Sequence, residues 1–412
     1  MEAREIDEKL EYYGQRLSER IKKDTMTPRE RVLKLMNFEE PDRLPGPTGL
    51  AESFAAKHAG LKLSEVCKDP KKFVLSQLML MDLVEQEFPQ AEYDVYNIEA
   101  EALGCELLWP EDSFPVVAPG GEVLKEKSDL DKLQVPDFRK DGRGPYCLEV
   151  NKLLLSSAQG ILPYYFCISP FDIAFKIRGF TRLIKDIKKD PKFAHELLEF
   201  CTAVATEYTR TLHDELTPLG GAEPFMWGAS CDLPLIGEKI YKEYALPYAA
   251  KVIEKNPYVS WGIFRFVEYF GEKWPEFWEY YIVESKAPIV FMYGMDTKIA
   301  DLTLAKSIAA KHKRFMIVGT DAETIRYSSY EELDERIRRH IRCTAPGGGA
   351  APVKLDTVPA DTPVERFRYI VQKVKEYGRY PIDVEGLKPI EAMYDEEARP
   401  GYLQGKRKRP VF

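Results

Sequence analysis

Acidic side chains follow several strand-like segments of this chain. Glu99 and Glu101 stand two residues apart directly after one such segment, and Asp321 follows another. Two carboxylates held close together can have separated pKa values and share the roles of general acid and base. The alternatives are that a glutamate pairs with a basic residue and that Asp321 caps the next helix. The pattern therefore indicates Glu101, Glu99 and Asp321 as candidate catalytic residues.

Two further acids and an arginine occupy comparable positions. Asp232 follows the apolar run 225–228, and Asp296 follows the run 290–294. Arg265 can hold a substrate carboxylate or stabilise developing negative charge, and its alternative is a salt bridge with a neighbouring acid. We interpret these three residues as candidates for substrate binding.

Aromatic residues are concentrated between positions 258 and 281. Trp261 and Phe264 follow no helical period and can line a pocket for a flat ligand, either a tetrapyrrole or an aromatic substrate. A later quartet at helical spacing is predicted to face the core: Trp274, Phe277, Trp278 and Tyr281.

A run of three glycines at 347–349 offers backbone amides that can approach a phosphate, which makes Gly348 a candidate substrate contact. The run lacks the strand and helix context of a dinucleotide fingerprint. Its alternative is a tight entry into a strand.

The seven cysteines and five histidines show no metal-ligand spacing. No two cysteines form a C-x-x-C pair, and no histidine lies two residues from a cysteine. The cysteine count is odd and the positions are scattered, so no disulfide framework is indicated. We therefore predict no metal site from these residues.

The composition predicts a globular protein with a large core, since 44% of its 412 residues are hydrophobic and 31% are charged. A net charge of −8 makes nucleic acid an unfavourable partner. No apolar stretch is long enough to cross a bilayer, and the first 25 residues lack the apolar segment of a secretory signal. We expect a cytoplasmic protein without a membrane partner.

Residues 1–25 are predicted to form a helix whose apolar stripe packs against the chain's own body or against a second copy in a homodimer. The stripe comprises Ile6, Leu10, Tyr13, Leu17 and Ile21. Capping-box patterns predict helix starts at 27–30, 329–332 and 362–365.

Strand and helix patterns alternate along the rest of the chain, which predicts an α/β protein with parallel strands but leaves open a closed barrel or an open sheet. The predicted strands are Ile161–Ile168, Pro288–Tyr293, Arg314–Val318 and Gly348–Val353. The predicted helices are Lys192–Thr211, Lys239–Glu254 and Tyr330–Ile341.

Several blocks in a fixed order resemble one superfamily. They are Met26–Pro45 (MTPRERVLKLMNFEEPDRLP), Glu99–Glu106 (EAEALGCE), Leu246–Tyr248, Ala345–Gly349 (APGGG) and Pro359–Glu365. Together they resemble the superfamily of uroporphyrinogen decarboxylase and the corrinoid-linked methyltransferases. The resemblance implies a TIM (β/α)₈ barrel over residues 26–382, between an N-terminal helical arm (1–25) and a C-terminal tail (383–412). It also implies that the chemistry lies at the carboxyl ends of the strands.

The decarboxylase branch of the superfamily is matched poorly. Its substrate-holding arginines are absent from Leu44–Glu52, its tyrosine falls at Lys176 and its late histidine at Asp356. Asp94 lies near the position of the catalytic aspartate, one residue out of register, and is a candidate substrate contact. Because several carboxylates cannot be desolvated without cations, a uroporphyrinogen substrate is disfavoured.

The thiol-methylating branch binds zinc through H-x-C and a further cysteine in a P-G-C-G turn. The matching segments here read VSWGIFRF at Val259–Phe266 and PGGG at Pro346–Gly349. The resemblance therefore implies no zinc site of the family type and no thiolate chemistry of that branch.

The resemblance favours a methyltransferase-like enzyme that moves a methyl group between a small substrate and a corrinoid (cobalamin) carried by a partner protein. A carboxylate such as Glu101 would act as acid or base. One alternative is a decarboxylase that uses Arg265, Lys176 or Arg178 as its cations. Another is a non-catalytic protein that binds a tetrapyrrole or a corrinoid protein.

Overall fold

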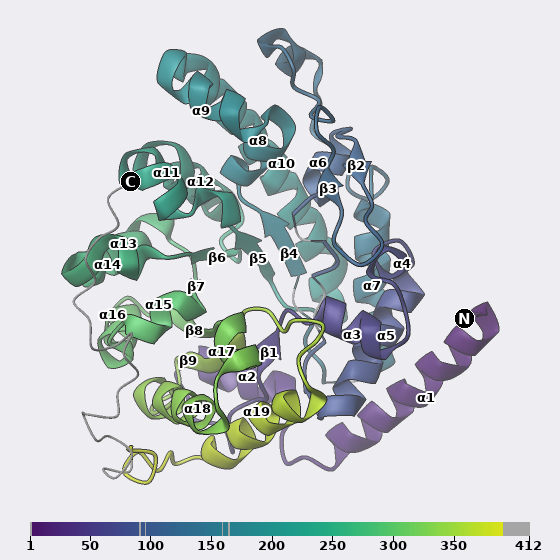
Figure 1. Ribbon diagram of the computed structural model, residues 1–412, viewed down its shortest axis with the longest axis vertical. Coiled ribbons are helices and arrows are strands. Elements are labelled where there is room, and N and C mark those ends of the chain that lie inside the picture. Colours follow the sequence, from purple (N-terminus) through teal and green to yellow (C-terminus); the bar gives the residue numbers. More distant parts are fainter. Residues whose placement is uncertain (1, 90–91, 95, 159, 164, 390–412) are drawn as a thin grey trace.

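The computed structural model describes residues 2–89, 92–94, 96–158, 160–163 and 165–389. Its centre is a sheet of seven parallel strands in the order β1-β9-β8-β7-β6-β5-β4. The strands curl around a common interior and the helices lie outside them (Figure 1). This arrangement confirms the predicted α/β barrel architecture, with seven parallel strands among the described residues where eight were predicted. The stretch between β1 and β4 includes residues outside the described ranges.

The sheet strands are β1 (Thr48–Gly49), β4 (Tyr165–Ile168), β5 (Pro224–Trp227), β6 (Ser260–Ile263), β7 (Ile289–Met292), β8 (Phe315–Thr320) and β9 (Ala350–Leu355). A separate antiparallel pair consists of β2 (Leu107–Leu108) and β3 (Val116–Val117). Pairing of Thr48 with Lys354 joins β1 to β9, the first strand to the last.

The α-helices are α1 (Ala3–Lys22), α2 (Pro28–Met36), α3 (Glu52–His58), α4 (Leu63–Val66), α5 (Pro70–Val84), α6 (Ile98–Ala102), α7 (Gly144–Ser157), α8 (Pro170–Arg178), α9 (Phe180–Lys189), α10 (Pro191–Leu216), α11 (Leu233–Ile240), α12 (Leu246–Lys255), α13 (Phe266–Phe270), α14 (Trp274–Ser285), α15 (Gly294–Ile299), α16 (Leu302–Lys311), α17 (Ala322–Tyr327), α18 (Tyr330–Thr344) and α19 (Val364–Tyr377). Short helical turns are η1 (Lys127–Lys132), η2 (Thr217–Leu219), η3 (Ala229–Cys231), η5 (Gly271–Lys273) and the π-helical η4 (Tyr241–Ala245).

All four predicted strands and all three predicted helices are present, with shifted ends. The helix expected at 239–254 is formed by the end of α11, the π-helical η4 and α12. No helix among the described residues has the length and apolarity needed to span a membrane.

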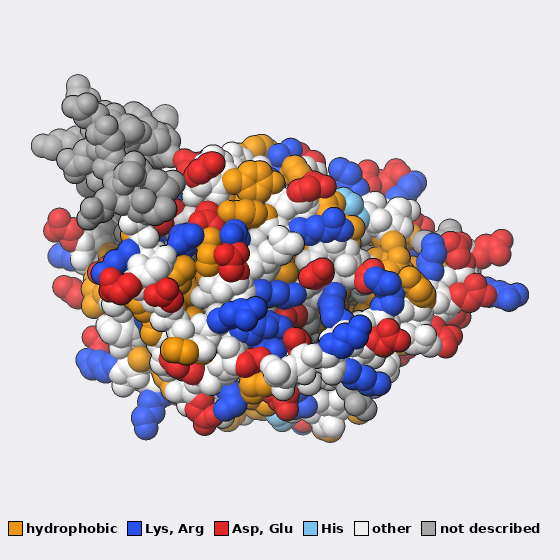
Figure 2. Space-filling model, turned by 90° about the horizontal axis from the view of Figure 1, so that it is seen from below, with side chains coloured by type: hydrophobic (Ala, Val, Ile, Leu, Met, Phe, Trp, Pro, Cys, Tyr) orange, Lys and Arg blue, Asp and Glu red, His pale blue; other side chains and the backbone are white. Residues whose placement is uncertain are grey.

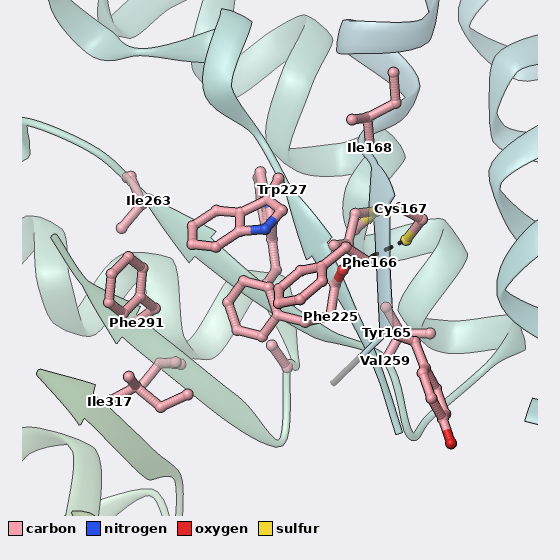
Figure 3. Packing of buried hydrophobic residues seen from close by; sticks show 14 of the residues in the cluster. Tyr165, Phe166, Cys167, Ile168, Phe225, Trp227, Val259, Ile263, Phe291 and Ile317 are labelled. Atoms are coloured by element: carbon pink, nitrogen blue, oxygen red, sulfur yellow. Dashed lines mark hydrogen bonds between the residues drawn. The ribbon is translucent and has the colours of Figure 1, made fainter. Parts of the chain in front are cut away.

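The interior of the sheet is aromatic. Phe166 and Trp227 stack with their rings 5.9 Å apart, and Phe225 and Phe291 pack beside them (Figure 3). These side chains point inward from neighbouring strands and fill the space between them, as large residues do in a packed barrel core. The cavity described below therefore begins only above this layer.

Helix α1 packs along α5 on the outside of the sheet (Figure 1). Ile6, Leu17 and Ile21 of the predicted stripe are buried, and Leu10 and Tyr13 are partly buried. The arm therefore covers the body of its own chain, which was the first of the two interpretations of the stripe.

Two of the three predicted capping boxes form, at Thr27 with Glu30 and at Ser329 with Glu332. The third prediction is wrong. Helix α19 begins one residue later than expected, with Pro363 as its N-cap. Thr362 then lies outside the capping position, and its buried hydroxyl has no hydrogen-bond partner.

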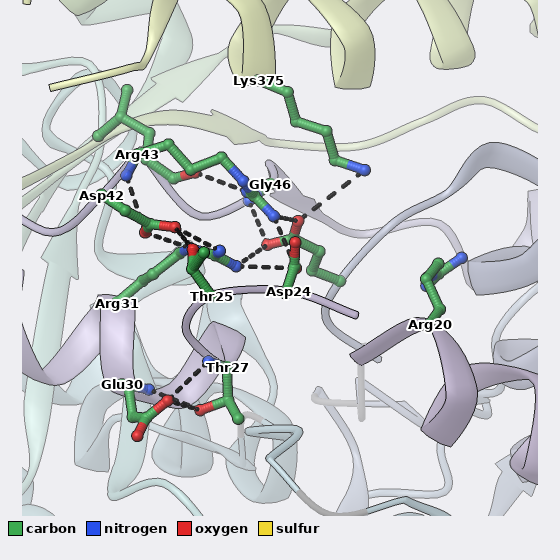
Figure 4. A network of polar contacts seen from close by, with 12 residues as sticks. Arg20, Asp24, Thr25, Thr27, Glu30, Arg31, Asp42, Arg43, Gly46 and Lys375 are labelled. Atoms are coloured by element: carbon green, nitrogen blue, oxygen red, sulfur yellow. Dashed lines mark hydrogen bonds and ion pairs between the residues drawn. The ribbon is translucent and has the colours of Figure 1, made fainter. Parts of the chain in front are cut away.

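The segment that leads into β1 is held by an ion-pair network (Figure 4). The fully buried guanidinium of Arg31 donates two hydrogen bonds to Asp42, at 2.8 and 2.9 Å, and one to Asp24. Arg43 pairs with Glu87 at 2.6 Å, and Glu87 also accepts the backbone N–H of Gly46. The segment Glu39–Pro45 of the Met26–Pro45 block is thus structural, since it fixes the chain at the amino end of the barrel.

Figure 2 shows the face seen from below Figure 1, where acidic and basic side chains are interspersed and Lys and Arg gather near the middle. The net charge of −8 is therefore not spread evenly over the surface.

Candidate functional site

A cavity of about 250 Å³ opens at the carboxyl ends of the strands. It lies where barrel enzymes place their chemistry. Its lining residues lie at or just after the ends of β1, β5, β6, β7 and β9, except for Tyr96, which precedes α6: Leu50, Tyr96, Trp227, Ala229, Asp232, Phe264, Arg265, Tyr293, Asp356 and Thr357. Three of the predicted contacts, Asp232, Phe264 and Arg265, are among them.

Asp356 is the more deeply buried of the two lining carboxyl groups. Its Oδ2 accepts the backbone N–H of Gly294 at 2.7 Å, and its Oδ1 has no hydrogen-bond partner. Burial raises its pKa to about 7, against the opposing charge of Lys354. A Cβ atom at Gly294 or Gly319 would lie within 2.4 Å of this carboxyl group. Both glycines are therefore needed to make room for Asp356.

Asp232 is the second lining carboxyl group. Its Oδ2 lies 3.6 Å from Nη1 of Arg265, while its buried Oδ1 has no hydrogen-bond partner. Burial raises its pKa to about 6, and Arg265 opposes the rise. The salt bridge that was the alternative for Arg265 is therefore present. A carboxyl oxygen at the cavity is still left unpaired.

A second polar layer lies beneath the cavity. Burial, together with the carboxyl group of Glu92, raises the pKa of Glu52 well above its usual range. Burial raises the pKa of Glu92 to about 8, with Lys354 opposing. Nζ of Lys354 lies 5.2 Å from the ring centres of both Trp227 and Phe291. Burial thus disfavours the charged form of both glutamates.

Asp296 has a positioning role. It is buried under the turn after β6 and accepts the backbone N–H groups of Arg265 at 2.7 Å and Val267 at 2.8 Å. The turn places Arg265 in the left-handed region, at φ +55°. Burial raises the pKa of Asp296 to about 7. Asp296 therefore fixes the backbone that carries Arg265 and does not itself line the cavity.

Of the two aromatic residues predicted to hold a ligand, one lines the cavity. Phe264 packs 5.3 Å from Trp227 and 5.0 Å from Tyr293. Trp261 is fully buried on the other side of the sheet, stacked on Tyr241 of η4 and against Tyr281 of α14. Alternation along β6 sends it toward the helices, so the structure places Trp261 in the core. The later quartet, Trp274, Phe277, Trp278 and Tyr281, is buried as predicted.

Glu99 and Glu101 do not form a carboxylate pair. Glu99 is fully buried and accepts the backbone N–H of Ile168 at 2.8 Å. Glu101 pairs with Arg143, which also bonds Asp94 at 2.5 Å. One helical turn of α6 thus directs the two glutamates to different partners, and none of these acids lines the cavity.

The raised pKa of Glu99 predicts how the stability of the fold depends on pH. Burial raises its pKa from 4.5 to about 8, so the folded chain binds a proton there that the unfolded chain loses. Its stabilising contribution is therefore present at low pH and is lost as pH rises from about 4.5 through 8. Glu99→Gln removes this titrating group. The unfolding free energy of the variant should therefore fall less steeply with pH across this window, by up to the slope that corresponds to about one proton. Urea denaturation between pH 5 and 9 measures the slope. The exposed Glu149→Gln is the control, and equal slopes for Glu99→Gln and wild type would refute the assignment.

Asp321 and Gly348 also lie outside the cavity lining. Asp321 caps α17 by accepting the N–H and hydroxyl of Thr324, and it pairs with Lys298 at 2.9 Å. Gly348 lies at the amino end of β9, where an added Cβ would meet the backbone of Phe38 and Glu39. The structural alternative therefore describes both residues. Asp321 is a helix cap, and Gly348 allows a tight entry into a strand.

The donor set offers no metal centre. Among the described residues, no group of three or more His, Cys, Asp or Glu side chains is arranged to hold a metal ion. The seven cysteines are free, and burial raises the pKa of Cys231, the one that follows β5. The residues present thus do not fit the zinc site of the thiol-methylating branch.

Comparison with known families identifies the family of the chain. The family model for uroporphyrinogen decarboxylase (URO-D) matches residues 27–377. The chain belongs to the uroporphyrinogen decarboxylase family. The matched range begins at the capping box of α2 and ends with α19, so the family fold includes the whole sheet and its cavity.

The relatives found for this URO-D family member are methyltransferases. One is the methylated-thiol–coenzyme M methyltransferase of Methanosarcina mazei, 26% identical over 232 residues, which are 54% of this chain and 59% of that protein. Another is a methylcobamide:CoM methyltransferase of Methanosarcina acetivorans, 25% identical over 235 residues, or 55% of this chain and 66% of that protein. The matches thus span about two thirds or less of each relative.

A solved methyltransferase from Methanosarcina mazei has the same fold. It superposes with a TM-score of 0.70 at 16% identity and covers 85% of this chain and 99% of the solved one. The URO-D family fold predicted from sequence is therefore confirmed, and so is the similarity to corrinoid-dependent methyltransferases.

Several residues at or beside the cavity carry polar groups and were not predicted as site residues: Asp356, Glu52, Glu92, Lys354, Tyr96, Tyr293 and Trp227. Glu52 stands directly after the first strand, and Lys354 is a charged residue within an apolar strand. Those two positions were the available signals, because a charge inside a barrel strand is costly without a role.

Proposed function

We propose that this protein transfers a methyl group between a small substrate held in the cavity and a corrinoid carried by a partner protein. The similarity to two corrinoid-linked methyltransferases supports this proposal. The observation that carries it is the cavity itself, whose lining carboxyl groups each have one buried oxygen without a partner. Such oxygens are satisfied when a polar ligand binds.

Asp356 and Asp232 take the acid–base role that sequence analysis gave to Glu101. The substrate heteroatom changes its charge or proton count when a methyl group leaves or arrives. Carboxyl groups whose pKa values are raised to about 7 and about 6 can give or accept a proton at neutral pH. Glu101 is tied to Arg143 away from the cavity and is better described as structural.

The corrinoid would lie outside the cavity. A volume of about 250 Å³ is below the roughly 300–1,000 Å³ of pockets for drug-sized ligands, and a corrinoid is larger still. The cobalt centre supplies the methyl acceptor or donor when it is presented at the opening. Phe264, Tyr293 and Arg265 lie at the cavity and would hold the substrate toward that opening.

Decarboxylation of a polycarboxylate is less well supported. Arg265 is the only cation among the described lining residues, and it is already paired with Asp232. Lys176 and Arg178, the other cations considered, are not among those residues. A substrate with several carboxylates would thus face an acidic cavity without compensating charge.

A direct assay separates these functions. The purified chain is mixed with methylcobalamin or cob(I)alamin and candidate methyl acceptors or donors, and the visible spectrum is followed. We expect a protein-dependent change in the cobalamin spectrum. Carbon dioxide release from a carboxylated porphyrinogen, or an unchanged spectrum with every methyl donor and acceptor class, would overturn the proposal.

A further inference from the structure

We propose that the cavity recognises a methylated ammonium group, so that the small substrate is a quaternary or tertiary methylamine. This inference rests on the proposed function and names the substrate class of the same site. It is carried by two independent features of the cavity, its aromatic walls and its unpaired acidic oxygens.

The aromatic walls present several ring faces to one small volume. Phe264 lies between Trp227 and Tyr293, with ring centres 5.3 and 5.0 Å away and planes inclined by 35° and 62°. Tyr96 lines the same cavity. Rings set at steep angles around one space cannot all stack on a single planar ligand. They suit a rounded ligand, and aromatic faces attract ammonium groups in particular.

The acidic oxygens supply a full counter-charge. Oδ1 of Asp356, a residue only 3% exposed, has no hydrogen-bond partner, and neither has the buried Oδ1 of Asp232, whose side chain is 19% exposed. A bound cation satisfies both oxygens by charge without needing to donate a hydrogen bond. A neutral ether would leave them unpaired, at a cost comparable to a lost hydrogen bond for each.

The charges around the cavity disfavour an anionic ligand. The two lining acids are Asp356 and Asp232, and the nearby cations are Lys354 and Arg265, while burial disfavours the charged forms of Glu52 and Glu92. Lys354 lies over Trp227 and Phe291 below, and Arg265 is paired. The described lining thus offers no unpaired cation to an anionic ligand, whereas the carboxylate of Asp356 attracts a cation.

Bonds and electrons balance when a methyl group is transferred from such a substrate. The C–N bond breaks with its electron pair staying on nitrogen, and the methyl carbon is taken by the reduced corrinoid, which supplies the new pair. The nitrogen thereby loses its positive charge. The neutral amine is a stronger base than a carboxylate, so a proton that enters from water is held by the amine nitrogen, and the product is an ammonium ion with one methyl group fewer.

The test compares two ligands of the same shape. Choline carries a trimethylammonium group, and 3,3-dimethylbutan-1-ol is its neutral isostere. Isothermal titration calorimetry of the full chain measures the dissociation constant of each. We expect choline to bind at least ten times more tightly. Equal affinity of the two ligands, or no binding of choline, would overturn the inference.

Two variants locate the binding and one controls it. Asp232→Asn should remove most of the preference for choline, and Phe264→Leu, which keeps an apolar side chain, should reduce it several-fold. Glu268→Gln is the matched control, because Glu268 also lies 3.6 Å from Arg265 but is outside the cavity lining. An equal loss in Glu268→Gln and Asp232→Asn would contradict a site at this cavity.

The two proposals fail in different ways. Methyl transfer to cobalamin from another substrate class, without choline binding, would leave the proposed function standing and reject the ammonium site. Choline binding with no change in any cobalamin spectrum would support the ammonium site and reject methyl transfer.

Discussion

Replacing Asp356 by asparagine is expected to lower kcat/KM for methyl transfer by about 10²–10⁴-fold, the range typical of a lost general acid or base. Asparagine keeps the size of the side chain and an oxygen that can accept the N–H of Gly294. It removes the charge and the proton that change during the reaction. The loss should therefore appear in activity while the fold is retained, as judged by circular dichroism and thermal unfolding.

Asp361→Asn is the control for that experiment. Asp361 lies in the same connection after β9, but its side chain is 60% exposed and pairs with Arg326 on the surface. We expect its kcat/KM to stay within about twofold of wild type, since exposed ion pairs contribute little. Full activity of Asp356→Asn in the cobalamin assay would remove Asp356 from the mechanism.

Replacing Arg31 by alanine is expected to destabilise the fold by about 3 kcal/mol, the lower end of the range for a broken buried ion pair, because its partners Asp24 and Asp42 are 34% and 30% exposed. The Arg31 side chain is fully buried and bonds Asp42 through two nitrogens and Asp24 through a third. Without it, these acids and the nearby Glu87 face one another in the anchor of the first strand (Figure 4). Urea denaturation at neutral pH measures the change.

Lys34→Ala controls for the loss of a cation from the same helix. Lys34 is 41% exposed and pairs with Glu39 at 3.2 Å. Its replacement should cost less than about 1 kcal/mol, because water already solvates both charges. If the Arg31 variant were no less stable than the Lys34 variant, the network would not anchor β1 as described.

The two substitutions separate the roles of charge at opposite ends of the sheet. At the amino end, Arg31 and its acids satisfy one another, so every charge has a partner and the effect is on stability. At the carboxyl end, Asp356 keeps an oxygen unpaired while its neighbours are buried. Incomplete pairing at a buried site is characteristic of functional residues.

Local patterns were enough for much of the architecture. The stripe of α1, the strands β4, β7, β8 and β9, and the capping boxes at Thr27 and Ser329 depend on neighbours within a few residues. The aromatic quartet of α14 was assigned to the core for the same reason. Thr362 was misjudged because one residue of shift in the helix start removes the cap.

The candidate site was predicted only in part. Asp232, Phe264 and Arg265 line the cavity because they directly follow strand ends. Asp321 also follows a strand, and Glu101 and Asp94 were predicted near one, but Arg143, Thr324 and Lys298 hold these acids in ion pairs and a helix cap. Sequence position gives nearness to the rim of a barrel but does not give the direction of a side chain.

The order of its elements and its family were determined by the sequence alone, since hydrophobic periodicity and motif order are properties of the chain. The tertiary structure decided which carboxyl groups keep an oxygen without a hydrogen-bond partner. Glu52, Asp356 and Lys354 are far apart in the chain or masked by apolar neighbours, and they meet only because β1 pairs with β9. Burial and counter-charge, which set the chemistry of each carboxyl group, arise from contacts that no local pattern records.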